Sequence, residues 1–152
     1  MLLASGCGHK SASREVHEAG ADRKVHIDLG DGPLDELTIL RGSDGRFVVA
    51  GVCLFPEDTR LEISVTDSTG ASVGNATVVV QHALIQTSPV GAPGAPGRPA
   101  LYRVRVSATF VPGLQSEPVM QAIGDGKRYH GEGMTKTLQG RLAYDRIFQV
   151  RM

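Results

Sequence analysis

The strongest constraint on the fold is a strict alternation of apolar and polar residues over 101–110, LYRVRVSATF. The apolar positions share one face: Tyr102, Val104, Val106, Ala108 and Phe110. The polar positions share the other: Arg103, Arg105, Ser107 and Thr109. A period of two indicates a β-strand with one face in the core and the other in solvent.

Shorter segments with strand character cover much of the remaining chain. They lie at 25–29, 36–39, 47–55, 61–66, 76–85, 117–123 and 141–150. The Asp44-Gly45 pair in SDGR marks a tight turn, and a loop is expected at 67–74. The 19 glycines and 8 prolines exceed average usage and favour many turns. We therefore predict an all-β fold, a single antiparallel β-sandwich of about seven or eight short strands over 25–152.

The first seven residues, MLLASGC, resemble the lipobox of bacterial lipoproteins, in which small residues precede a cysteine. The resemblance implies that Cys7 receives a diacylglycerol and that residues 1–7 are the remnant of a signal. The match departs from the family in two ways: no charged and apolar leader precedes it, and Ala4 stands where leucine is usual. A chance cysteine in a plain N-terminus is the alternative interpretation.

Residues 8–24 are polar, mixed in charge and nearly free of large apolar side chains. Such a stretch cannot offset the entropy cost of its own ordering, so we expect a disordered tether between anchor and domain.

Residues 46–150 resemble the small immunoglobulin-like or transthyretin-like β-sandwich domains of bacterial envelope lipoproteins. The resemblance is carried by GVCLFPEDTRLEISV at 51–65, ASVG at 71–74 and GAPGRPALYRVRV at 94–106. It implies an immunoglobulin-like sandwich, and a bacterial envelope location that is periplasmic or associated with the outer membrane. Tyr102 further resembles the tyrosine corner of such sandwiches, a structural hydrogen bond to upstream backbone. The antibody pattern itself fails because the chain has no Trp and Val104 replaces the second cysteine.

The segment 124–133, GDGKRYHGEG, is the strongest candidate for a binding loop, with Lys127, Arg128, Tyr129 and His130 at its centre. It lacks the Ser or Thr that follows Gly-Lys in a phosphate-binding loop, and its acids are too few for a calcium loop. A mobile hairpin loop is the alternative interpretation of the same residues.

The sequence favours neither a catalytic centre, nor a cofactor, nor a metal site. It has no HExxH or SxxK motif, and Cys53 lies in an apolar run where burial makes a thiol inert. Sixteen basic and sixteen acidic residues cancel, so there is no electrostatic reason to expect a nucleic-acid partner.

We therefore expect a non-catalytic module of the cell envelope, anchored through Cys7, with a structural or protein-interaction role. Its partners would be the membrane, through the lipid, and another envelope protein. The alternative is a small-ligand or carbohydrate-binding module that uses loops 88–99 and 124–133 together.

Overall fold

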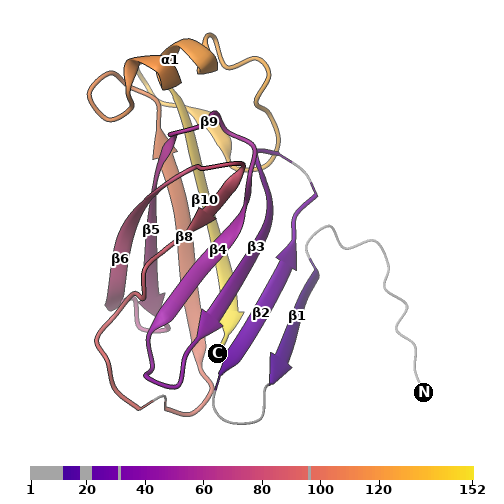
Figure 1. Cartoon of the computed structure of the whole chain (residues 1–152), viewed down its shortest axis with the longest axis vertical. Coiled ribbons are helices and arrows are strands. Elements are labelled where there is room, and N and C mark those ends of the chain that lie inside the picture. Colours follow the sequence, from indigo (N-terminus) through magenta and orange to yellow (C-terminus); the bar gives the residue numbers. More distant parts are fainter. Residues whose placement is uncertain (1–11, 18–21, 31, 96) are drawn as a thin grey trace, which may run out of the picture.

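Two antiparallel sheets pack face to face in the computed structural model, which describes residues 12–17, 22–30, 32–95 and 97–152 (Figure 1). The first sheet has the order β1 (Ala12–His17), β2 (Arg23–Asp28), β3 (Leu34–Arg41), β4 (Phe47–Cys53) and β7 (Leu84–Gln86). The second has the order β6 (Ser72–Val79), β5 (Arg60–Asp67), β8 (Leu101–Thr109), β10 (Leu142–Arg151) and β9 (Met134–Lys136). The predicted all-β antiparallel sandwich is therefore confirmed.

The core lies between the sheets and follows the predicted alternation. On β8, Val104 and Val106 are fully buried while Arg103 and Arg105 are exposed. Facing strands supply Ile39, Val49 and Ile63, which are also fully buried. Three aromatic rings fill one end of the core: the ring centroid of Phe55 lies 5.0 Å from that of Phe110 and 5.6 Å from that of Tyr144.

The predicted Asp-Gly turn joins β3 to β4. Gly45 adopts a φ of 80°, which an L side chain would strain, and its N–H donates to the Gly42 carbonyl at 3.0 Å. The Asp44 carboxylate accepts the backbone N–H of Arg46 at 3.0 Å, so the turn residues fix the hairpin locally.

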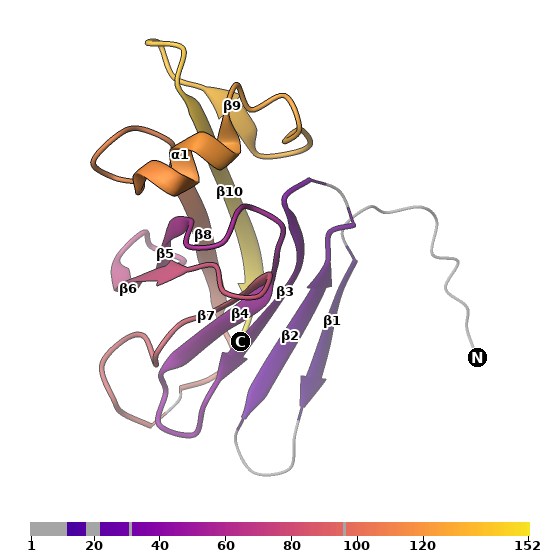
Figure 2. The ribbon, with the colours of Figure 1, turned by 45° about the horizontal axis from the view of Figure 1, so that its top comes forward.

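The prediction of a strand at 117–123 is wrong, because this segment forms the helix α1 (Glu117–Ile123) at one end of the sandwich (Figure 2). Pro118 sits in its first turn, where the missing N–H costs no helical hydrogen bond. Val119 and Ile123, four residues apart, bury one face of the helix against the core.

The expected loop at 67–74 and strand at 76–85 are both displaced. The loop is a tight turn after Asp67, and β6 begins at Ser72. The strand ends at Val79 because His82 and Ala83 adopt φ values of 55° and 61°. This turn carries the chain from one sheet to the other, where β7 pairs with β4.

The structure also differs from the prediction of a tether over 8–24. Ala12–His17 form β1 and pair antiparallel with β2, with Arg14 opposite His26. Backbone pairing with an existing sheet edge supplies hydrogen bonds that the composition of this segment does not reveal. The other residues of the expected tether before Asp22 lie outside the described residues.

No helix among the described residues is long and apolar enough to cross a membrane.

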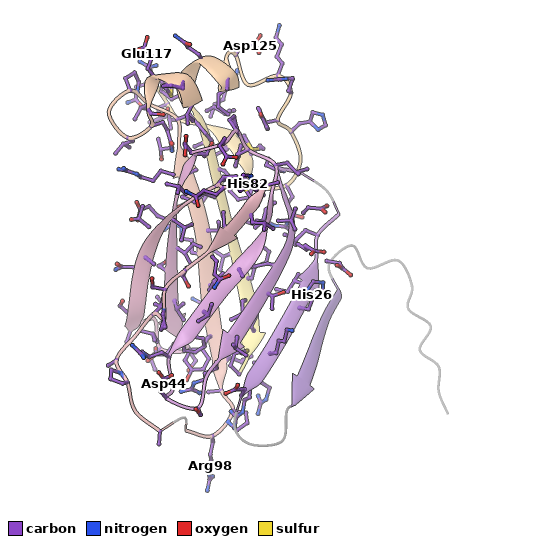
Figure 3. The ribbon with its side chains drawn as sticks, in the orientation of Figure 1. His26, Asp44, His82, Arg98, Glu117 and Asp125 are labelled. Carbon is purple, nitrogen blue, oxygen red and sulfur yellow. The ribbon has the colours of Figure 1, made fainter. Side chains whose placement is uncertain are left out.

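The two loops proposed as a joint ligand site lie far apart: Arg98 is at one end of the sandwich and Asp125 at the other (Figure 3). Residues 88–99 and 124–133 therefore do not form one shared concavity.

Candidate functional site

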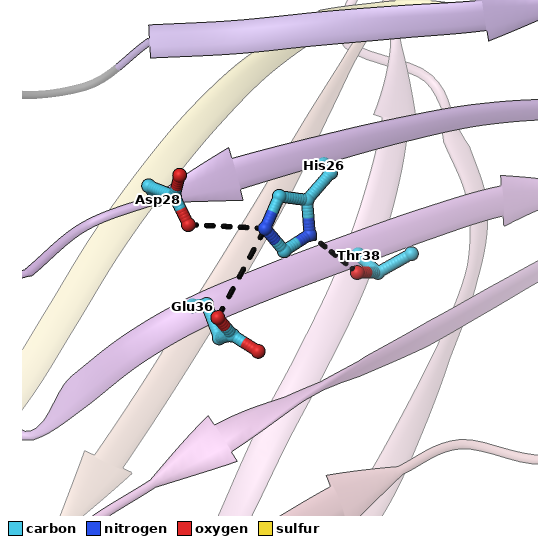
Figure 4. Close-up of polar contacts among 4 residues, drawn as sticks. All are labelled: His26, Asp28, Glu36 and Thr38. Atoms are coloured by element: carbon cyan, nitrogen blue, oxygen red, sulfur yellow. Dashed lines mark hydrogen bonds and ion pairs between the residues drawn. The ribbon is translucent and has the colours of Figure 1, made fainter.

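Four polar side chains meet on the outer face of the first sheet (Figure 4). In the antiparallel pairing of β2 with β3, His26 lies opposite Thr38 and Asp28 lies opposite Glu36. The residues between them, such as Ile27 and Leu37, are buried on the inner face and hold the backbone in place. Alternation on two paired strands thus projects all four polar side chains outward.

The His26 ring contacts the other three side chains through its two nitrogens. Nδ1 lies 2.9 Å from Thr38 Oγ1, and Nε2 lies 3.0 Å from Asp28 Oδ1. Glu36 Oε2 lies 3.9 Å from the same Nε2. The ring is thereby oriented by Thr38, and its second nitrogen faces two carboxylates.

The Nδ1 contact with Thr38 is compatible with both tautomers of a neutral imidazole, whereas the Nε2 contact with Asp28 is a hydrogen bond only when Nε2 carries the proton. In one, Nε2–H donates to Asp28 while the Thr38 hydroxyl donates to Nδ1. In the other, Nδ1–H donates to Thr38 Oγ1 and the Nε2 lone pair points toward the carboxylates, because a hydroxyl can donate or accept. The second arrangement places one nitrogen and two oxygens around a common point, which suits a cation.

Sequence reasoning missed this cluster because His26 stands at the end of the expected tether, and Asp28 and Glu36 are separated by a turn. A signal was present in hindsight: the outward positions of two adjacent strands carry His, Asp, Glu and Thr. The strand register, which the sequence did not specify, decides that they are neighbours.

A second feature is the edge of β10 beyond the short strand β9. Strand β9 pairs only with Leu142–Tyr144 at the start of β10, and no described strand pairs with the same edge from Ile147 to Arg151. The N–H of Asp145 donates to the Gly133 carbonyl at 2.9 Å on this side. Because backbone groups alternate along a strand, the N–H groups of Ile147 and Gln149 point to the same unpaired edge.

A groove of about 480 Å³ runs beside this edge. It is lined by Ile27 from the first sheet, Glu132 and Gly133 from the preceding loop, and β10 residues 145–149. Its walls combine the apolar side chains of Ile27 and Phe148 with exposed backbone groups of β10.

The charged residues of this edge are held by defined contacts. Arg146 Nη2 donates to Glu132 Oε2 at 2.8 Å, and its guanidinium lies 5.1 Å from the centroid of the Phe148 ring. On the outer face, Arg105 Nε donates to Asp145 Oδ1 at 2.7 Å. The hydrogen bond and charge of Arg105 hold the pKa of Asp145 below its usual range.

Of the four residues at the centre of the predicted binding loop, Tyr129 is half-buried and the other three are exposed. The Tyr129 ring packs 5.3 Å from that of Phe55, and Arg128 Nη2 donates to the Ala122 carbonyl at 3.1 Å. Lys127 and His130 are exposed and line a shallow hollow beside the loop. Ligand binding by Lys127, Arg128, Tyr129 and His130 stays a prediction.

The remaining predicted positions have separate environments. Cys7 lies outside the described residues. Tyr102 is half-buried, its ring 5.0 Å from that of Phe47 and 5.2 Å from the Arg41 guanidinium. Its hydroxyl makes no hydrogen bond to another described residue, so the tyrosine-corner bond stays a prediction.

Cys53 is a buried free thiol. Burial raises the pKa of this thiol to about 11, which leaves it protonated at neutral pH.

His82 and His130 do not join an acid in any cluster of metal-ligating side chains within the described part of the chain. The backbone N–H of His82 instead donates to Glu57 Oε2 at 3.0 Å. Comparison with known proteins gives no match to a family model, to a curated protein or to a solved structure.

Proposed function

We propose that this protein is a non-catalytic β-sandwich module of the bacterial cell envelope that binds an extended segment of another envelope protein. A lipid on Cys7 would anchor it, and the segment would add to the second sheet along β10. The observation that carries the proposal is the edge of β10 that no described strand pairs with, beside a groove lined by Ile27, Phe148 and several charged or polar residues.

An unpaired edge of this kind is a template for strand addition. Ile147 and Gln149 offer backbone donors and acceptors that an incoming strand satisfies, which supplies affinity without regard to its sequence. Alternate side chains of that strand would enter the groove between Ile27 and Phe148, so apolar residues at every second position are favoured. The unpaired stretch, about 17 Å long for five residues, fits a short extended segment.

The finer family assignment, an immunoglobulin-like or transthyretin-like domain of envelope lipoproteins, belongs to the same proposal. It is supported by the motifs at 51–65, 71–74 and 94–106 and by the chain crossing between sheets after β4, β6 and β7. The envelope location is supported by the lipobox resemblance around Cys7.

Site-specific photo-cross-linking in bacterial cells tests the partner. A benzophenone amino acid at Ile147 is compared with one at Glu62, which is exposed on the outer face of β5, an interior strand of the same sheet. We expect a discrete adduct from position 147 alone, with the cross-link mapped to an extended segment of the partner.

The Gln149→Pro variant removes an edge N–H without adding charge, and Gln149→Ala is its matched control because it retains that N–H. Proline should lower the adduct yield at least tenfold while alanine leaves it unchanged. Equal adducts from positions 147 and 62, or equal yields from the two variants, would overturn the proposed binding edge.

The anchor is tested separately by mass spectrometry of the protein expressed from its own genomic locus. A diacylglycerol-modified Cys7 that is lost in Cys7→Ser supports the envelope address. An unmodified Cys7 would contradict the lipid anchor and the envelope location. The proposed binding edge would then be judged by the cross-linking result alone.

A further inference from the structure

We propose that His26, Asp28 and Glu36 form a binding site for a divalent transition-metal ion such as Zn²⁺, with Thr38 as the residue that orients the histidine. The site lies on the outer face of the first sheet, and the inference does not depend on the binding edge of β10. It rests on the convergence of three different ligand atoms and on the contact made by the other ring nitrogen (Figure 4).

The ligand atoms already lie close to the spacing that a metal requires. One nitrogen or oxygen from each of the three side chains lies within 4.8 Å of the others. Ligands about 2.0–2.2 Å from a tetrahedral zinc ion are separated by roughly 3.3–3.6 Å. The Nε2–Oδ1 separation of 3.0 Å and the Nε2–Oε2 separation of 3.9 Å bracket that range. Small rotations of the exposed Asp28 and half-buried Glu36 carboxylates are enough to bring all three atoms onto one ion.

The chemistry of the ligand set selects the class of metal. An imidazole nitrogen favours zinc, copper or nickel over calcium and magnesium, which prefer oxygen ligands throughout. Two carboxylates balance the charge of a divalent ion. Three protein ligands leave further coordination positions for water, as the exposure of the cluster permits.

Thr38 supplies the contact that metal-binding histidines characteristically make through their second nitrogen. In the metal-bound form, Nδ1–H donates to Thr38 Oγ1, and the Nε2 lone pair binds the ion. The neutral ring changes tautomer when the ion binds: Nε2 gives its proton to solvent and Nδ1 takes one up, so no net proton is released. The paired strands beneath the cluster are fixed by Ile27 and Leu37, which form the rung between the two cluster pairs and are buried on the opposite face. On the far side of β2, the backbone of β1 places Arg14 opposite His26, the nearest basic position in register.

Isothermal titration of the purified protein with ZnCl₂ near neutral pH tests the site. We expect one saturable site in the wild type that is lost in His26→Ala and weakened at least tenfold in Asp28→Asn and Glu36→Gln. His82→Ala is the matched control, since that exposed histidine lies outside the cluster, and it should bind as the wild type does. Thr38→Val, which keeps the shape and removes the hydroxyl, should weaken binding roughly tenfold.

Histidine ¹⁵N NMR gives a readout that a merely structural role would not move. On addition of Zn²⁺ the Nε2 resonance of His26 should take the shift of a metal-bound nitrogen, while Nδ1 becomes protonated. Circular dichroism of each variant shows that the fold is kept. Equal binding by wild type and His26→Ala, or no saturable binding by the folded wild type, would overturn the site.

Discussion

At the scale of single residues, the geometry near the proposed binding edge depends on one glycine. Gly133 has a φ of 96°, and its carbonyl accepts the Asp145 N–H that joins the loop to β10. A Cβ at this position would lie 2.7 Å from Cε1 of Tyr144, whose ring is almost fully buried. The positive φ and the contact with a buried ring both favour glycine at this position.

Gly133→Ala should therefore destabilise the protein by about 1–3 kcal/mol more than Gly140→Ala. Gly140 also has a positive φ, 78°, but an added Cβ there meets nothing within 4 Å. The difference between the two variants isolates the clash with Tyr144 from the backbone strain they share. Urea denaturation measures both, and equal losses would show that the contact with Tyr144 is unimportant.

The ion pair between Arg105 and Asp145 makes stability depend on acid. Because the pKa of Asp145 is lowered in the folded state, the pair stabilises the protein above the ordinary aspartate pKa of about 3.9. That contribution is lost as the pH falls through the lower, folded value. The side chains are 53% and 40% exposed, so solvent screening limits the effect to below about 1 kcal/mol.

Asp145→Asn should reduce the free energy of unfolding at pH 7 by that small amount, and the difference from wild type should shrink toward zero near pH 2. Arg105→Gln should give the same loss, and the double variant no more than either single one. Denaturation curves across this pH range measure the effect. Additive losses in the double variant would show that the two residues do not act as a pair.

At the scale of elements, α1 shows where the sequence pattern does not distinguish a helix from a strand. The seven residues EPVMQAI place Val119 and Ile123 four positions apart, but so short a segment is also compatible with a strand. The choice is made by tertiary packing, because the helix covers one end of the core beside Phe110. Strand β8 was predictable because its alternation of apolar and polar residues spans nine residues.

Ile123→Ala should destabilise the protein by about 2–4 kcal/mol because it leaves a cavity under the helix. The control is Gln121→Ala on the exposed side of the same helix, which should change stability by less than about 0.5 kcal/mol. Thermal unfolding compares the two. A small effect of Ile123→Ala would show that the helix lies on the surface without contributing to the packing of the core.

At the scale of the whole molecule, the sequence predicted the sandwich but not its register. Alternation specifies which face of a strand is buried, and Val104 and Val106 were correctly placed on it. It does not specify which strands are neighbours. It therefore could not bring His26 beside Glu36 or show that, among the described strands, none pairs with β10 beyond β9. Both candidate sites arise from that second level of organisation, whereas the motif-based expectation of one site from two loops failed because the loops lie at opposite ends.

The two proposed binding sites of the molecule are built on different sheets. The histidine cluster is on the outer face of β2 and β3, and the proposed binding edge is on β10.

Residue-resolved amide hydrogen exchange tests the central claim about β10 most directly. In the isolated protein we expect the N–H groups of Ile147 and Gln149 to exchange rapidly, while those of Phe148 and Val150, which face β8, are protected. A soluble heptapeptide of alternating threonine and valine between terminal lysines should slow exchange at Ile147 and Gln149 at least tenfold in the wild type and have no effect at Ile147 in Gln149→Pro. Equal protection of all four amides in the isolated protein, or no slowing by the peptide, would contradict the account.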